Sequence, residues 1–150
     1  MGRRVGKRLR RKLTRFAHSF NIHISIRNDK EMSTCFADSR IELGIKGWNK
    51  GRFTKYSTEE LAWSYLIHEV IHALCYRSGK WSSFHSGFDG KKSGEAFRRT
   101  AVKAEMWVED LSEKGLKAMF PSYKFYRSYT RSEASINWLR THYHTIKRKH

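Results

Sequence analysis

The order of hydrophobic and polar positions predicts one helix near the start of the chain, a group of short strands, and then further helices. Residues 3–18 place apolar side chains at steps of three and four among basic ones, which is typical of an amphipathic helix. Alternation of apolar and polar residues predicts strands over 22–27, 33–38 and 40–45, followed by a loop over 46–56.

Two long helices are predicted in the second half of the chain. Ser57 and Glu60 have the spacing of a capping box, so we expect a helix from there to about residue 76. Its middle is apolar on most sides, which favours a buried, central position. A second helix is expected over 93–113 and is closed by Gly115. After an irregular stretch over 116–129, a second capping box at 130–133 predicts a last helix over 131–147. This order of elements predicts an α+β fold.

The length and composition of the chain limit its class. A chain of 150 residues predicts a single domain. Its two cysteines, Cys35 and Cys75, form no CxxC pair, which argues against a disulfide scaffold or a zinc ribbon. No apolar run has the length of a membrane span, and no apolar segment follows the basic start as in a secretory signal. We therefore expect an intracellular protein, in the cytoplasm or with the nucleic acid of the cell.

Charge indicates the kind of partner. The formal net charge is +17, and the first sixteen residues carry eight Lys or Arg and no acid. Such a field attracts polyanions, nucleic acid above all, and DNA is favoured over RNA. The candidate contacts are the basic clusters near the two ends, Arg8, Arg10, Arg11, Lys12, Lys147, Arg148 and Lys149. Aromatic residues interleave with bases over 117–150; base stacking is one role for them, but the sequence favours packing in a core.

The strongest chemical signal is HEVIH, in the middle of the first long helix. His68 and His72 are four residues apart, so both imidazoles project from one face and can bind one Zn²⁺. Glu69 lies about 100° round the helix, where it can act as a general base on a water rather than as a ligand. The pattern therefore predicts a zinc-dependent peptidase that hydrolyses peptide bonds of a protein substrate.

A catalytic zinc site needs a third protein ligand and leaves the fourth position open. His85 follows His72 by thirteen residues in a loop and is the favoured candidate. Glu105, on the second long helix, is the alternative, and Asp89 is the weakest of the three.

Three segments together resemble the SprT-like (Spartan-type) zinc metallopeptidases. They are RIELGI at 40–45, LIHEVIHAL at 66–74 and GEAF at 94–97, and the resemblance covers about residues 5–112. It implies one small zincin-like domain over 1–150, with a basic helix at 1–18, a catalytic core at 19–115 and a basic aromatic extension at 116–150. It also implies an endopeptidase acting on proteins bound to DNA, with zinc on His68, His72 and His85 and with Glu69 as the base.

The sequence departs from that family in one place. The family has glycine directly after the third histidine, whereas here Ser86 intervenes and GEAF follows only after an insertion. A glutamate-type zincin with Glu105 as third ligand therefore stays open. A further alternative is a non-catalytic nucleic-acid-binding or nucleoprotein-assembly module with a structural zinc site, for which Glu69 would not be needed.

Overall fold

The computed structural model describes residues 2–36, 39–78 and 95–128, except for the side chains of 95–102. The described helices and strands are α1 (Lys7–His18), β1 (His23–Arg27), β2 (Thr34–Phe36), β3 (Arg40–Gly44), α2 (Thr58–Arg77) and α4 (Glu95–Met119). The protein is thus a mixture of helices and a small three-stranded sheet, which confirms the predicted α+β class. None of the described helices combines the length and the apolar character that a membrane crossing requires.

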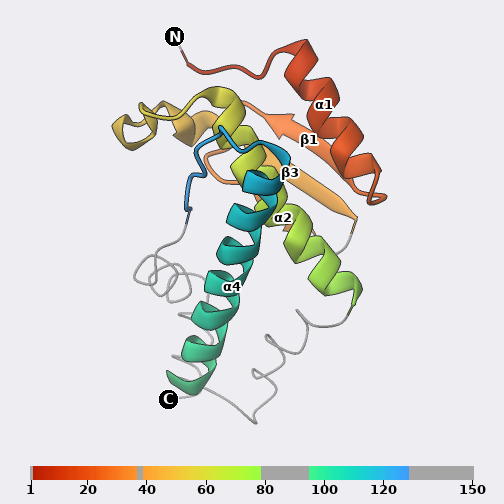
Figure 1. The fold of residues 1–150 in the computed structure, drawn as a ribbon, viewed down its shortest axis with the longest axis vertical. Helices are drawn as coiled ribbons and strands as arrows, with labels where there is room; N and C mark the ends of the chain where they lie inside the picture. The colour runs from red at the N-terminus through yellow and green to blue at the C-terminus, as the bar shows by residue number, and fades with distance from the viewer. Residues whose placement is uncertain (1, 37–38, 79–94, 129–150) are drawn as a thin grey trace.

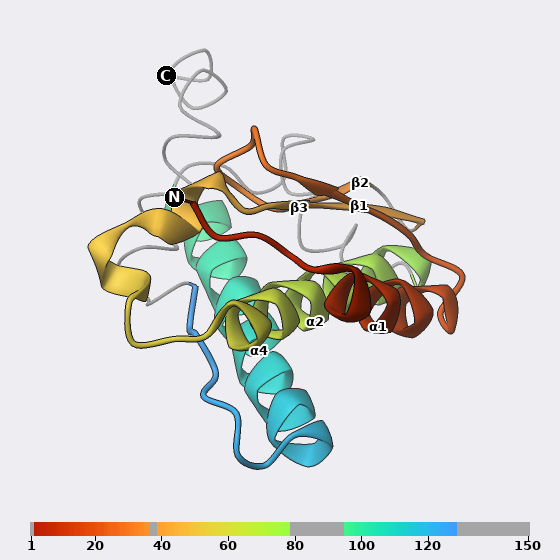
Figure 2. The ribbon, with the colours of Figure 1, turned by 90° about the horizontal axis from the view of Figure 1, so that it is seen from above.

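The sheet has the order β1-β3-β2, with β3 in the centre. β1 runs parallel to β3 with Ile24 opposite Ile41 and Ile26 opposite Leu43, whereas β2 is antiparallel to β3. Because side chains alternate along a strand, these apolar residues share one face of the sheet. That face is covered by α1 and α2, which lie side by side beneath the sheet in Figure 2. The predicted burial of Ile41 and Leu43 is confirmed, since both are fully buried, although Glu42 between them is buried as well.

α2 is the central element of the fold. One side of it packs on β2 and β3, and the other side is crossed by α4, so the helix lies between two layers (Figure 1). Twelve of its twenty residues are buried. The sequence-based expectation of a buried central helix is therefore confirmed, and any polar group in its middle must find its partners inside the protein.

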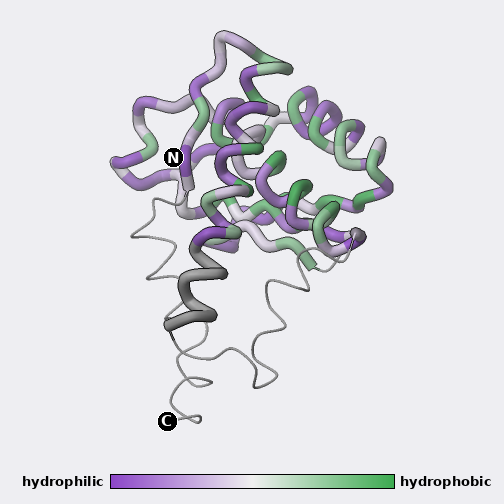
Figure 3. Tube along the Cα trace, turned by 60° about the horizontal axis from the view of Figure 1, so that its bottom comes forward, coloured by the Kyte–Doolittle hydropathy of each residue, from purple (hydrophilic) through white to green (hydrophobic). Residues whose placement is uncertain are grey.

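α1 begins later than the pattern of residues 3–18 predicts. Gly6 is extended (φ −70°, ψ 166°) and the helix starts at Lys7, with no acidic residue in the first turn to favour an earlier start. Leu13 and Ala17 are fully buried against the domain. The Lys and Arg residues of α1 are all exposed. Figure 3 shows hydrophilic and hydrophobic residues interspersed along the described helices.

The segment expected to be a plain loop over 46–56 contributes to the core. It forms two 3-10 turns, Lys46–Asn49 and Gly51–Phe53. Trp48 and Phe53 are each only 1% exposed, and the Trp48 ring stacks on Tyr65 of α2 with the centroids 5.5 Å apart. Large aromatic burial fixes this segment beside α2.

The prediction that Gly115 ends the second long helix is wrong, because α4 continues to Met119. The glycine lies where α4 crosses α2, and a Cβ there would meet Ile67 at 3.6 Å. Leu116, in the next turn, is fully buried. The stabilisation from this burial outweighs the low helix propensity of glycine. The predicted last helix and its capping box lie outside the described residues.

The described start of the aromatic extension packs on the main core. Tyr123, Phe125 and Tyr126 contact it, and the Tyr126 ring lies 4.7 Å from that of Phe53. For these residues the expectation of core packing is confirmed.

Candidate metal centre

The position of the HEVIH segment follows from how α2 begins. The Ser57 hydroxyl accepts a hydrogen bond from the Glu60 backbone N–H at 3.0 Å, and the Glu60 carboxylate accepts one from the Ser57 N–H at 2.9 Å. This is the predicted capping box, and it fixes the register of the helix from its first turn. His68 and His72 then fall on the same face, three and four turns from the start.

The two histidine rings meet inside the protein. Their Nε2 atoms are 3.0 Å apart and their ring centroids 4.7 Å apart, and the residues are 2% and 6% exposed. The rings therefore converge with one nitrogen each on a common point, as the i, i+4 spacing predicts.

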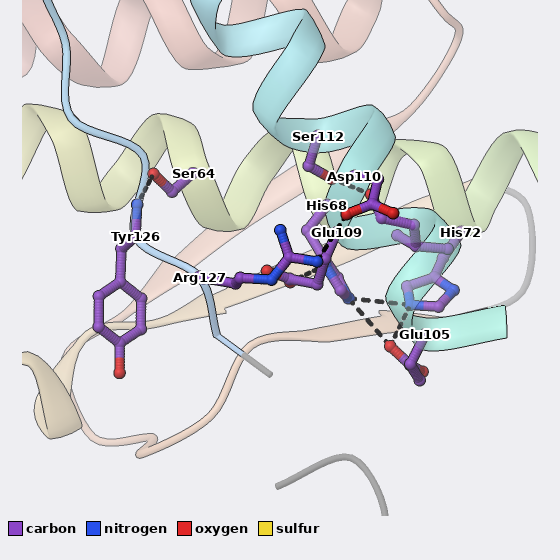
Figure 4. Close-up of polar contacts among 10 residues, drawn as sticks. Ser64, His68, His72, Glu105, Glu109, Asp110, Ser112, Tyr126 and Arg127 are labelled. Atoms are coloured by element: carbon purple, nitrogen blue, oxygen red, sulfur yellow. Dashed lines mark hydrogen bonds and ion pairs between the residues drawn. The ribbon is translucent and has the colours of Figure 1, made fainter. Parts of the chain in front are cut away.

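Glu105 of α4 reaches the same point from the other side. Its Oε2 lies 3.4 Å from Nε2 of His68 and 3.4 Å from Nε2 of His72 (Figure 4). These three residues are the set within the described part of the chain that could hold a metal ion. The other candidates for a third ligand, His85 and Asp89, lie outside the described residues. The structure thus brings together His68, His72 and the alternative third ligand.

The spacing of these three ligand atoms suits a small cation with tetrahedral coordination. A triangle with edges of 3.0, 3.4 and 3.4 Å has its corners about 1.9 Å from its centre, close to the ~2.0–2.1 Å of zinc bonds to nitrogen and carboxylate oxygen. Two imidazoles and one carboxylate are also a donor set that zinc accepts in catalytic sites, with a fourth position for water or substrate. The residues therefore fit zinc in both geometry and chemistry.

Glu109 supports this site one turn further along α4. It is fully buried, and its Oε1 lies 2.6 Å from Nδ1 of His68. A carboxylate at Nδ1 holds the proton on that nitrogen, so Nε2, on the side of Glu105, is the nitrogen that can bind a metal. Sequence analysis missed this residue. The available signal was its position four residues after Glu105, which puts both carboxylates on one face of α4.

Glu69 stands apart from the three converging atoms. It is 9% exposed and, with His68, lines a cavity of about 340 Å³ between α2, the chain before β2 and the two 3-10 turns. Burial raises the pKa of the Glu69 carboxyl, and positive charge on His68 and His72 opposes this rise. Glu69 is thus a buried carboxylate that lines a cavity together with one of the two histidines.

Ionisation couples the members of the cluster. Burial by itself lowers the pKa of His68, but hydrogen bonds to Glu105 and Glu109 overcome this effect and raise it to about 10. Burial likewise disfavours the charged form of Glu105, yet the two histidines hold the pKa of its carboxyl well below its usual range. Protonation of His68 and binding of a cation by its Nε2 are therefore expected to compete.

The basic residues predicted to contact nucleic acid lie on α1 where the structure describes them. Arg8, Arg10, Arg11 and Lys12 are all exposed. Lys12 is 3.6 Å from the carboxylate of Glu59, so part of its charge is neutralised. The second predicted cluster, Lys147, Arg148 and Lys149, lies outside the described residues.

Comparison with known proteins returns no relative for this chain. No protein-family model, curated protein or solved structure matches it.

Proposed function

We propose that this protein is a zinc-dependent metallopeptidase whose zinc ligands are His68, His72 and Glu105. The observation that supports this most directly is the convergence of three ligand atoms, 3.0–3.4 Å apart, from two crossing helices. A structural zinc site would have no use for a buried carboxylate facing an adjacent cavity, so the position of Glu69 favours a catalytic role.

The residues of the chain have separable tasks in this proposal. Zinc, when bound, supplies a Lewis acid for a peptide carbonyl and makes a water acidic enough to attack at neutral pH. Glu69 accepts the proton of the attacking water and later delivers it to the leaving amine nitrogen. Glu109 keeps His68 in the orientation and tautomer that a ligand requires.

The fold proposed for this activity is a small zincin-like domain. A three-stranded sheet backed by the HEVIH helix, with a second long helix crossing behind it, supports that assignment. The resemblance to SprT-like peptidases remains a proposal. The approach of Glu105 to the histidine pair favours the glutamate-type arrangement over His85 as third ligand.

Metal analysis combined with peptide hydrolysis tests the proposal. We expect the parent protein to bind one zinc ion, Glu105→Gln to lose it and His85→Ala to keep it. Glu69→Gln is expected to keep both the fold and the zinc while hydrolysis falls by roughly 10²–10⁴-fold, the usual contribution of a general base. Glu113→Gln is the matched control on α4. Zinc retained by Glu105→Gln, or full hydrolysis by Glu69→Gln, would refute the assignment.

We further propose that the exposed bases of α1 hold the enzyme on nucleic acid or on nucleoprotein substrates. The net charge of +17 and the outward position of Arg8 and Arg11 support this role. Arg8→Glu with Arg11→Glu should weaken DNA binding and reduce its salt slope by about one unit per lost phosphate contact. Arg27→Glu with Arg40→Glu, on the opposite face of the sheet, is the charge-matched control. Equal losses in both pairs would show that net charge alone is responsible.

A further inference from the structure

The cavity beside Glu69 has a charge pattern that the proposed reaction does not use. Its rim carries Glu31, Lys50 and Arg52, and its wall is formed in part by Tyr65 of α2. With a volume of about 340 Å³ it is at the small end of ligand-binding pockets, enough for one or two side chains of a peptide.

Two of these charges neutralise each other. Lys50 Nζ lies 3.2 Å from the carboxylate of Glu31, and both side chains are more than half exposed. Their pairing leaves Arg52 as the cation of the lining that is in none of the described ion pairs, while the Glu69 carboxylate lines the same cavity.

Arg52 is an exposed residue whose guanidinium lies over an aromatic ring. None of the described ion pairs includes it, and its guanidinium carbon lies 4.9 Å from the centre of the Phe53 ring. Its charge also acts on Tyr65. Burial raises the pKa of the Tyr65 hydroxyl above its ordinary range, and a hydrogen bond with Ser128 and, to a lesser degree, the charge of Arg52 oppose that rise. Arg52 and Tyr65 line the same cavity, and the hydroxyl of Tyr65 is a group that can donate a hydrogen bond.

We infer that this cavity is a specificity subsite that binds an acidic side chain of the polypeptide substrate, through Arg52 and the Tyr65 hydroxyl. The inference rests on the proposed peptidase function, because it assigns the substrate residue next to Glu69. A carboxylate is favoured because a planar guanidinium binds it with two parallel hydrogen bonds. The strongly positive field of the whole protein attracts acidic polypeptides to the same surface.

Peptide binding tests the subsite separately from catalysis. The probe is a fluorescent heptapeptide with a central Glu, and its counterparts carry Gln or Lys at that position. Binding is followed by fluorescence anisotropy on the zinc-loaded Glu69→Gln protein, in which the peptide is not consumed. We expect the Glu peptide to bind about tenfold or more tightly than the Gln peptide, as is usual for a charge-assisted hydrogen bond. Adding Arg52→Gln should abolish this preference, and adding Arg52→Glu should turn it towards Lys.

Arg40→Glu is the matched control for Arg52→Glu. Arg40→Glu changes the net charge by the same amount, and it also removes a guanidinium that lies over an aromatic ring, 4.3 Å from the centroid of Phe36. Arg40 does not line the cavity. The inference is wrong if the Glu and Gln peptides bind equally, if no peptide binds, or if Arg40→Glu removes the preference as fully as Arg52→Glu.

Competition separates the peptide from a nucleic-acid phosphate as occupant. A short single-stranded oligonucleotide should leave the preference for the Glu peptide over the Gln peptide unchanged. If the oligonucleotide abolishes this preference by occupying Arg52, the subsite binds phosphate and the peptide assignment is wrong. Zinc content and hydrolysis by the parent protein report on the proposed function independently, so either idea can fail while the other stands.

Discussion

The contact between His68 and Glu109 makes a quantitative prediction about zinc affinity. Glu109 is fully buried and its carboxylate lies 2.6 Å from Nδ1 of His68. Glu109→Gln keeps the shape of the side chain and an acceptor oxygen but removes the negative charge that holds the proton on Nδ1. Loss of such a supporting group usually lowers metal affinity by about 10–100-fold, or about 1.4–2.7 kcal/mol.

That loss is measurable as thermal stability. Zinc stabilises the folded protein according to how far its free concentration exceeds its dissociation constant. For a chain of this size, about 1 kcal/mol corresponds to roughly 2–4 °C in Tm. The increase in Tm produced by saturating zinc should therefore be smaller in Glu109→Gln by about 3–10 °C, and competition with a chromophoric chelator should give the same affinity ratio.

The assay needs two comparisons. The metal-free Tm of each variant separates loss of zinc from loss of packing. Glu113→Gln, one turn further along α4, makes the same chemical change away from the histidines and should leave the zinc-induced shift unchanged. If Glu109→Gln binds zinc within a factor of two of the parent, or if Glu113→Gln loses as much, the role assigned to Glu109 is refuted.

Four further results are expected. Zinc binding should release a proton, because the pKa of His68 is raised to about 10 in the metal-free protein. The zinc affinity should therefore fall as pH is lowered, and the binding enthalpy measured by titration calorimetry should depend on the ionisation enthalpy of the buffer. A binding enthalpy that is the same in all buffers would mean that no proton is released. Ser57→Ala removes the cap of α2 and should cost about 1 kcal/mol in urea unfolding, so an unchanged midpoint would argue against the cap. Leu13→Ala, in the buried face of α1, should lower the free energy of unfolding by about 2–5 kcal/mol. A loss below about 0.5 kcal/mol, as is usual for a surface residue, would mean that α1 does not pack on the domain. Gly44→Ala should destabilise the sheet, because the new Cβ would overlap the backbone carbonyl of Met32, and wild-type stability in that variant would contradict the close approach of the chain before β2 to β3.

The sequence by itself determined the features that depend on neighbours a few residues apart. Alternation located the three strands, the Ser57–Glu60 pair located the start of α2, and the spacing of His68 and His72 put both rings on one face. These features are local because helix and strand geometry fix which side chains share a face.

Only the tertiary structure decided which distant groups meet the histidines. The crossing of α4 over α2 brings Glu105 to the histidine pair and Glu109 behind it, although Glu105 follows His72 by more than thirty residues. The same crossing carries α4 past Gly115, where sequence rules favour an end. The order β1-β3-β2 and the folding of Arg52 onto the rim of the cavity likewise depend on packing. The physical reason is that burial of apolar surface sets how the elements pack, and no local spacing in the chain encodes that arrangement.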